Sequence, residues 1–290
     1  MMDVVLVYGL VNSAVLALMA VGFTLVYGIS RLANFAHGAL YVLTGFVSWI
    51  FLRTLGLNYA LAILIALIIT AMIGALIYHL FLVRVRSLEA SEIIGSFAVG
   101  LVIMEGLRWR GFIGHGFAIP KFVKGTVSIG WVMVDFQRII IIGIGLLIVI
   151  CLWLFTHHTK IGLALRAIAQ DEQAAMMLGM DSDRMATISL AVGSALAGLA
   201  AVAILPLGNL TVESGYQVLI YAVAVCIVGG LGSWPGAVVA AFLLGYAQVL
   251  TDQFGGTHYQ AVVAMAAIII TLILRPSGLF GRQKELEERV

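Results

Sequence analysis

Long apolar runs separated by short polar stretches dominate the chain. A helix needs about 20 apolar residues to cross the bilayer core, and nine runs reach or approach that length. They cover residues 4–29, 35–54, 59–82, 91–107, 138–156, 186–206, 216–231, 236–252 and 260–274. The pattern predicts an all-α fold, a polytopic transmembrane helical bundle of about eight or nine spans, with residues 1–290 forming one domain. The first run lacks the basic start and cleavage site of a signal peptide, so we expect it to remain as a span.

Two parts of this pattern depart from full-length spans. The run at 91–107 is short, and glycines break the chain between the runs 216–231 and 236–252. Short or glycine-broken segments in transporters are often half-helices, so half-helices are an alternative at both places.

One long polar stretch, residues 157–184, separates two apolar runs and reads HHTKIGLALRAIAQDEQAAMMLGMDSDR. Its charged side chains would be costly in hydrocarbon, so the segment lies in water. Ile161, Leu165, Ile168 and Ala175 recur at helical spacing, which predicts one amphipathic helix, and Gly179 is expected to end it. Such a helix can dock onto a soluble partner or lie on the membrane surface, and the pattern favours neither.

The basic residues predict the orientation of the bundle. If 157–184 is cytoplasmic, ten of the 16 Lys and Arg residues are cytoplasmic and six are outside, as the positive-inside rule expects. The N-terminus is then outside and the C-terminus is cytoplasmic. The ten are Arg31, Arg84, Arg86, Lys160, Arg166, Arg184, Arg275, Arg282, Lys284 and Arg289. The largest outer loop, 108–137, is rich in glycine and is expected to be an irregular connection or a surface for an extracytoplasmic partner.

Composition excludes several classes of protein. The chain is 62% hydrophobic and 10% charged, a balance that no soluble domain has. A net charge of +2, with dispersed basic residues, gives no nucleic-acid surface. The sequence contains no P-loop, paired carboxylates, H-E-x-x-H or G-x-S-x-G, so neither ATP binding by the usual loop nor enzymatic, metal or cofactor chemistry is expected. The absence of Arg-rich spans and of a filter motif weakens a channel interpretation.

Polar residues at membrane depth are candidates for a translocation path. Asn34 and His37 are three residues apart and would share one face of a helix. They either line a path or gate, or Asn34 caps the second span and His37 bonds a backbone carbonyl. The complete candidate set is Thr24, Tyr27, Asn34, His37, Gly38, Gly230 and Gly232.

The break at residues 229–236 has two interpretations. Its exposed amides could bind an anion, or it is a tight turn between antiparallel spans with Pro235 in the first turn of the second. Glu213 and Asp252 fall near the outer ends of spans and are interpreted as solvated caps. The sequence pattern shows no charged cage for an amino-acid zwitterion.

Four motifs occur in a fixed order along nearly the whole chain: GFTLVYGISRLANFAHGAL (22–40), RAIAQDEQAAMMLGMDSDR (166–184), GGLGSWPGAVVAAFLLG (229–245) and LRPSGLFG (274–281). Together they resemble the LivH-type permease subunits of ABC importers for branched-chain amino acids. The second motif is similar to the E-A-A-x-x-x-G loop through which importer permeases engage their ATPase. Here Gln173 replaces the usual Glu, and the closing Ile-x-Leu-Pro is absent.

The resemblance implies an assembly in the cell inner membrane. It implies pairing with a second homologous permease as a heterodimer, two ATP-binding cassette subunits that bind ATP, and an extracytoplasmic solute-binding protein received partly by the loop 108–137. The implied coupling residues are Arg166, Ala169, Asp171, Glu172, Gln173, Ala174, Ala175 and Gly179.

The implied function is import of small polar solutes, foremost branched-chain or other amino acids. Urea, short amides and carboxylates are alternatives within the family. A stand-alone channel or facilitator is the alternative of a different class, and it predicts flux without ATP.

Overall fold

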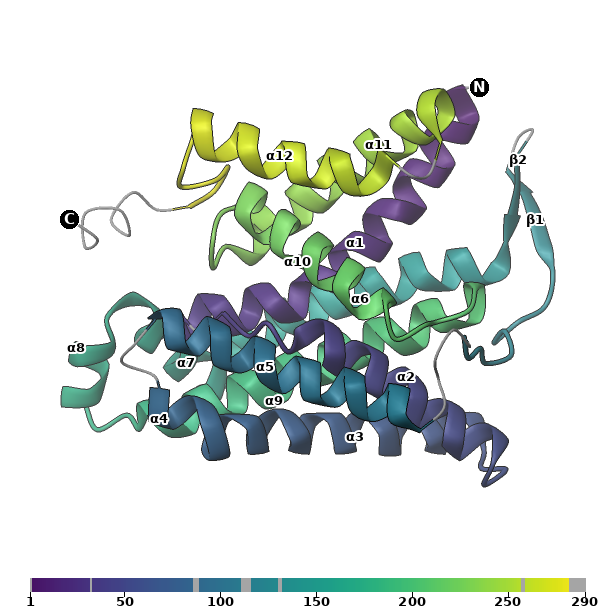
Figure 1. The fold of residues 1–290 in the computed structure, drawn as a ribbon. Coiled ribbons are helices and arrows are strands. Elements are labelled where there is room, and N and C mark those ends of the chain that lie inside the picture. The colour runs from purple at the N-terminus through teal and green to yellow at the C-terminus, as the bar shows by residue number, and fades with distance from the viewer. Residues whose placement is uncertain are drawn as a thin grey trace.

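The structure is a computed structural model that describes residues 2–31, 33–85, 89–110, 116–129, 132–256 and 259–281. Within these residues, nine helices follow the nine apolar runs of the sequence, which confirms the all-α transmembrane bundle (Figure 1). They are α1 (Met2–Ser30), α2 (His37–Arg53), α3 (Tyr59–Ile77), α5 (Glu89–Trp109), α6 (Phe136–His158), α9 (Ser182–Ile204), α10 (Ser214–Gly229), α11 (Trp234–Gly255) and α12 (Gln260–Leu274).

Helix length separates full spans from shorter helices. Six described helical segments are long and apolar enough to cross a membrane: Asp3–Ile29, Tyr59–Val85, Ala90–Trp109, Phe136–His158, Ser182–Leu207 and Trp234–Gly255. The run expected to be short at 91–107 lies in a helix of 21 residues, α5, so the half-helix alternative is wrong there. Helices α10 and α12 are shorter, with 16 and 15 residues.

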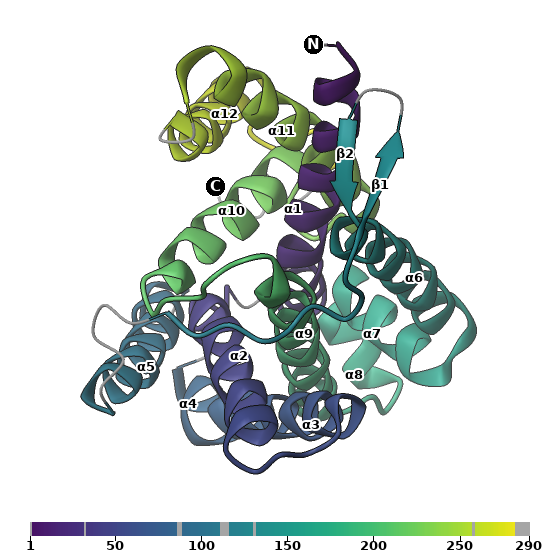
Figure 2. The same cartoon turned by 90° about the vertical axis from the view of Figure 1, so that its right-hand side faces the viewer.

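Helix α1 lies at the centre of the bundle and packs along α9 and α11, with further contacts to α6 and α10 (Figure 2). Small residues allow this close approach. A Cβ on Gly22 would lie 2.6 Å from the carbonyl oxygen of Gly193, so α1 and α9 touch backbone to backbone. A Cβ on Gly245 would lie 2.4 Å from Ser13 Oγ, which brings α11 equally close to α1.

The polar segment 157–184 forms two helices, α7 (Lys160–Gln170) and α8 (Glu172–Met177), so the prediction of one continuous helix is wrong. The break occurs at Asp171, which is extended and whose carboxylate accepts a 2.9 Å hydrogen bond from the amide of Ala174. An Asp in this position competes with the helical backbone bonds and starts a new helix instead.

The end of α8 follows the prediction made from Gly179. This residue has a φ of +84°, and its amide donates to the carbonyl of Met176, while the amide of Met180 donates to that of Ala175. This pair of bonds is a Schellman C-cap. Leu165, Ile168 and Ala175 are buried as the periodicity predicts, whereas Ile161 is exposed.

The loop 108–137 contains a β-hairpin that the sequence analysis did not predict. Strands β1 (Thr126–Ile129) and β2 (Val132–Asp135) pair antiparallel, with Thr126 opposite Asp135. Strands of four residues give too short an alternation to detect by periodicity. Before the hairpin, Phe117 and Leu210 exchange two 3.0 Å backbone hydrogen bonds, so this loop is tied to the segment between α9 and α10.

Different elements of the chain lie at the two ends of the bundle (Figure 1). Helices α7 and α8 project at one end, where Phe280 and Gly281 also lie, and the hairpin and the start of α1 lie at the other. Several residues used in the sequence analysis lie outside the described residues: Arg86, Arg282, Lys284 and Arg289 of the charge count, and residues 111–115 and 130–131 of the loop.

Candidate functional site

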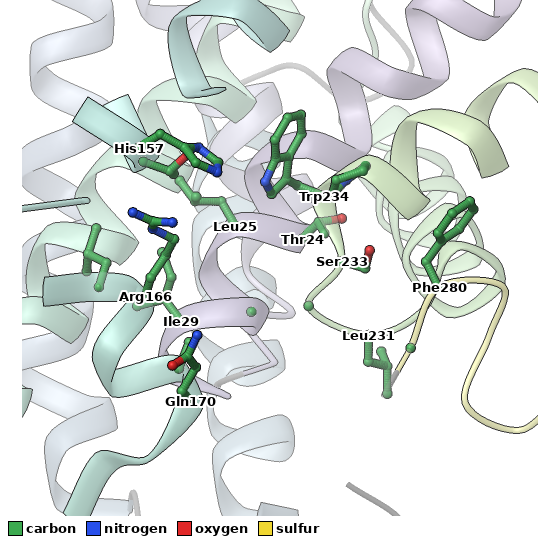
Figure 3. Close-up of a pocket in the computed structure, with 17 residues that line it drawn as sticks. Thr24, Leu25, Ile29, His157, Arg166, Gln170, Leu231, Ser233, Trp234 and Phe280 are labelled. Atoms are coloured by element: carbon green, nitrogen blue, oxygen red, sulfur yellow. The ribbon is translucent and has the colours of Figure 1, made fainter. Parts of the chain in front are cut away.

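A cavity of about 460 Å³ lies where α7 meets the end of α1 (Figure 3), and we call it the Arg166 pocket. It brings predicted coupling residues together with predicted path residues. Its lining residues come from five parts of the chain: Thr24, Leu25, Gly28 and Ile29 of α1; Thr156 and His157 of α6; Leu165, Arg166, Ala169 and Gln170 of α7; Leu231 to Pro235 of the α10–α11 turn; and Phe280 and Gly281.

Helix α7 is folded back tightly onto the end of α6. Thr159 caps α7 by accepting a 2.9 Å hydrogen bond from the amide of Gly162, and its hydroxyl donates to the carbonyl of Phe155. A Cβ on Gly162 would lie 2.1 Å from that carbonyl oxygen, so a larger residue would push the helices apart. Leu165 and Ile168 are buried against the bundle, and the neighbouring Arg166 turns into the pocket.

Two polar atoms that line the Arg166 pocket have no hydrogen-bond partner in the described part of the chain. They are Nε of Arg166 and the hydroxyl of Thr24, whose residue is 1% exposed. Buried polar groups are normally paired, so their common position marks the pocket as a wet or ligand-accessible space. In Figure 3, Arg166 and Gln170 lie on the α7 side, and Ser233 and Phe280 lie on the opposite side.

The turn between α10 and α11 forms that opposite side. Gly230 and Gly232 have φ values of +105° and +80°, and a Cβ on Gly232 would lie 2.9 Å from the Cα of Gly28. Only glycine therefore allows this turn to lie directly on α1. Ser233 caps α11 by accepting from the amide of Gly236, and Pro235 occupies the first turn, as predicted.

The LRPSGLFG segment closes the same side of the cavity. The amide of Leu279 donates a 2.9 Å hydrogen bond to the carbonyl of Val228, and that of Phe280 donates a 3.0 Å bond to Gly229. The segment thereby satisfies carbonyls at the end of α10. The last two sequence motifs, far apart from the first two in the chain, meet them around one pocket.

Of the candidate path residues, Thr24 and Gly232 line the Arg166 pocket, while Tyr27, Asn34, His37, Gly38 and Gly230 are not among its described lining residues. The predicted shared helical face of Asn34 and His37 is wrong, because α2 begins at His37. The Asn34 carboxamide accepts a 3.1 Å bond from the amide of Ala36, and His37 Nε2 lies 2.9 Å from the carbonyl oxygen of Met19. Both side chains are buried, and each is hydrogen-bonded to the backbone.

Gly38 allows α2 and α10 to pack closely. A Cβ there would lie 2.0 Å from the carbonyl oxygen of Gly215, so α2 and α10 make backbone contact at this point.

The candidate coupling residues divide into two groups. Arg166 and Ala169 line the pocket, whereas the rest build α8 and its two caps. The latter are Asp171, Glu172, Gln173, Ala174, Ala175 and Gly179. Ala175 packs inward, and the hydroxyl of Ser182 at the start of α9 donates to the carboxylate of Glu172.

Sequence reasoning missed the outer tip of α8. Met176, Met177 and Leu178 are 47%, 88% and 78% exposed, so three consecutive apolar residues point away from the bundle. We call these three residues the α8 tip. Its signal was visible in the sequence as an apolar triplet inside a segment that must lie in water.

Comparison with known proteins gives a consistent result. A family model described as "Branched-chain amino acid transport system / permease component" matches residues 5–272. The high-affinity branched-chain amino acid transport system permease protein BraD of Pseudomonas aeruginosa is 31% identical, over 96% of this chain and 95% of that protein. LivH of Escherichia coli K12, with the same description, is 28% identical over 94% of each.

More distant relatives extend the comparison. The ribose import permease protein RbsC of Escherichia coli K12 is 26% identical over 91% of this chain and 82% of that protein. The solved structure titled "PsaBC from Streptococcus pneumoniae in complex with Fab" has a TM-score of 0.52 and 15% identity, covering 98% of this chain and 94% of that one. This likeness shows a shared fold.

Proposed function

Because this chain belongs to the family of branched-chain amino acid transport permease components, we propose that it carries branched-chain or other small amino acids across the cell inner membrane. It is a multi-pass membrane permease of the ABC importer type. As a permease it supplies the path and not the chemistry, so ATP is bound and hydrolysed by two partner subunits and this chain needs no cofactor of its own. A second, homologous permease completes the path, and an extracytoplasmic binding protein delivers the solute.

The observation that carries this proposal is the α8 tip. A short helix, capped at both ends, holds three exposed apolar side chains in a polar segment between two helices long enough to span a membrane. Exposed apolar groups on a rigid, projecting element are typical of a protein docking site. The ATPase subunits that a chain without a P-loop requires are the partners that fit it.

Charge favours this docking over the alternative of a surface-bound helix. Four acidic residues, Asp171, Glu172, Asp181 and Asp183, flank the tip in the sequence, and the nearest basic residue, Arg184, pairs with one of them, Asp181. Anionic headgroups of the cytoplasmic leaflet would repel such a cluster. A soluble protein with a complementary groove would not.

The path from α8 to the bundle is short. Helix α8 follows α7 directly in the chain, and α7 contacts α1. Helices α7 and α1 both line the Arg166 pocket. Closure of the ATPase pair would move α8, and the packed helices would respond by switching between discrete arrangements. The Arg166 pocket is the space that such a movement would open or close.

This proposal also implies an orientation of the chain. Docking to a cytoplasmic ATPase would put α7, α8 and Gly281 in the cytoplasm and the hairpin and N-terminus outside, which is also what the Lys and Arg distribution predicts. The hairpin loop is then the surface that faces the binding protein.

The decisive experiment is reconstitution in liposomes. The chain is assembled with its permease partner, ATPase subunits and binding protein, and uptake of radiolabelled leucine is followed with and without ATP. ATP-dependent uptake supports the proposal. If urea or a simple carboxylate is taken up and leucine is not, the assigned substrate is wrong and becomes that solute. Uptake without ATP would refute the ATP-driven mechanism.

A further inference from the structure

A second cavity, of about 420 Å³, lies at the opposite end of α1, between α1, α6 and α11. Its volume is in the range of small-molecule sites. It brings together Arg138 from the first turn of α6 and Asp252 from the last turn of α11, residues far apart in the sequence. We call it the Arg138 pocket.

Neither charged group forms an ion pair with a described residue, although Asp135 lies close enough to Arg138 for the two charges to attract each other. Arg138 and Asp252 are half-buried, and the described residues include no ion pair or side-chain hydrogen bond to either of them. Asp135, one turn before Arg138, instead pairs with Lys121. A half-buried cation and a half-buried carboxylate that share one cavity without contacting each other leave room for a ligand of both charges between them.

The aromatic ring of Tyr8 holds the Arg138 side chain in place. The guanidinium carbon lies 4.7 Å from the centroid of the Tyr8 ring, a cation–π contact that fixes the side chain while leaving its donors available. The hydroxyl of Tyr8 is itself bonded to the carbonyl of Met133 in β2. The hairpin therefore positions Tyr8, and Tyr8 positions Arg138.

The remaining wall carries both aliphatic and polar side chains. Its aliphatic part is formed by Val4, Val11, Val15, Ile204, Leu207 and Val249. Its polar part includes Gln253, Gln260 and Asn12, whose carboxamide donates a 2.9 Å hydrogen bond to Gln248. A branched aliphatic side chain would gain from burial against the aliphatic part.

We propose that the Arg138 pocket is a subsite for a zwitterionic aliphatic α-amino acid, whose carboxylate pairs with Arg138 and whose ammonium group pairs with Asp252. This inference rests on the proposed function and favours amino acids over the other solutes of the family. Urea carries neither charge, and a simple carboxylate would leave Asp252 unpaired. The bidentate donors of Arg138 suit a carboxylate.

The position of this subsite fits a route along α1. The Arg138 pocket involves the first half of α1 and the Arg166 pocket its last turns. Between them, Leu18 and Val21 are buried in the core, so α1 separates the two cavities by one packed segment. A solute held in the first pocket would reach the second once that packing rearranges.

The test measures binding to the importer complex in nanodiscs without binding protein. Radiolabelled L-leucine is competed with 4-methylpentanoate, which lacks the ammonium group, and with 3-methylbutan-1-amine, which lacks the carboxylate. Each analogue should compete at least about tenfold more weakly than leucine, as expected for loss of one charge-assisted pair. Arg138→Gln and Asp252→Asn should each weaken leucine binding by a similar factor, and Arg138→Lys, which keeps the charge but lacks the bidentate donors, should restore part of it.

Lys124→Gln is the matched control, because Lys124 is an exposed cation in the loop before β1 and does not line the pocket. It should bind leucine like the unchanged chain. Size-exclusion chromatography establishes that each complex assembles. If the Arg138→Gln complex does not assemble, leucine binding by the Asp252→Asn and Arg138→Lys complexes decides the test.

Several outcomes would overturn the subsite. These are no detectable leucine binding by the unchanged complex, equal binding by Arg138→Gln and Asp252→Asn, or equal competition by the single-charge analogues. ATP-driven uptake with the binding protein present is measured in parallel. Uptake that persists while the binding test fails refutes the subsite alone, whereas absence of uptake in the unchanged complex refutes the proposed function.

Discussion

The hydroxyl of Tyr78 donates a 2.7 Å hydrogen bond to the carboxylate of Asp183. Tyr78 is fully buried in a π-helical turn, Tyr78–Leu82, that continues α3, and Asp183 lies in the first turn of α9 directly after the α8 segment. The bond thus ties the exit of the coupling segment to a neighbouring span. A π-helical turn inserted in an α-helix is frequent at functional positions, and here it directs Tyr78 at α9.

Tyr78→Phe removes this bond and keeps the ring. We expect a stability loss of about 1 kcal/mol, together with reduced coupling between ATP hydrolysis and uptake, because α9 is less firmly held. The measurement is thermal unfolding plus the ratio of solute imported to ATP hydrolysed. Tyr246→Phe is the control, since the exposed Tyr246 hydroxyl bonds the Leu6 carbonyl at the other end of the bundle. It should lose less stability than Tyr78→Phe, with an unchanged ratio of solute imported to ATP hydrolysed. Equal ratios in both variants would contradict the assignment.

Gly179→Asp tests α8 as the docking element. Gly179 has a φ of +84° and open space around its Cα, so the substitution strains the cap and adds charge beside the tip. We expect loss of ATPase co-purification and of uptake, with the chain still inserted in the membrane. Ala175→Asp, which buries a carboxylate under the tip, should do the same.

The matched control for Gly179→Asp is Gly56→Asp. Gly56 has a φ of +60°, equally open space, and lies in the turn between α2 and α3 near the hairpin loop. Gly56→Asp likewise places an aspartate at a positive-φ position, but at the opposite end of the bundle. Retained ATPase binding by Gly179→Asp, or its loss in Gly56→Asp, would argue against docking through α8.

Gly232→Ala tests the contact between the α10–α11 turn and α1. A Cβ at this position, with φ +80°, would lie 2.9 Å from the Cα of Gly28. We expect destabilisation of about 1–3 kcal/mol from the strained backbone, and slower uptake because the Arg166 pocket is deformed. Gly143→Ala, in open space within α6, should be neutral or slightly stabilising. Thermal unfolding of the two variants gives the comparison directly.

Lys121 and Asp135 predict a pH dependence at the hairpin end. The hydrogen bond from Lys121 holds the pKa of the Asp135 carboxyl below its usual range. A lowered folded-state pKa contributes stability above the unfolded value, and this contribution is lost as the pH falls through the folded value. Lys121→Met should therefore be less stable at neutral pH, and the difference should shrink below about pH 4. Thermal unfolding from neutral to acidic pH measures it, and a constant difference would contradict the prediction.

The sequence predicted the helices well because hydrocarbon imposes a single rule. Every backbone polar group in a membrane must be paired within its own segment, so each apolar run becomes a helix. The nine helices follow from that rule, and the cost of charge in hydrocarbon predicts the water-exposed segment. The cap at Gly179 follows separately, because glycine readily adopts the positive φ that ends a helix. Neither rule predicts the break at Asp171 or the hairpin, where local side-chain bonds and four-residue strands decide.

The candidate sites were harder to predict, because they depend on which ends of which helices meet. Asn34 and His37 stood out as polar residues in an apolar context, yet each is bonded to nearby backbone. Arg138 and Asp252 each resemble an ordinary solvated group at the end of a span. Only the packing of both α6 and α11 against α1 brings them into one cavity.

The central claim is that this chain is a permease driven through α8 by a separate ATPase. It is tested most directly by leucine flux into liposomes that contain the purified chain alone, compared with liposomes that contain the complete importer and ATP. The account predicts flux in the complete importer and none above the lipid background in the chain alone. Leucine flux through the chain alone, without partner proteins or nucleotide, would contradict it.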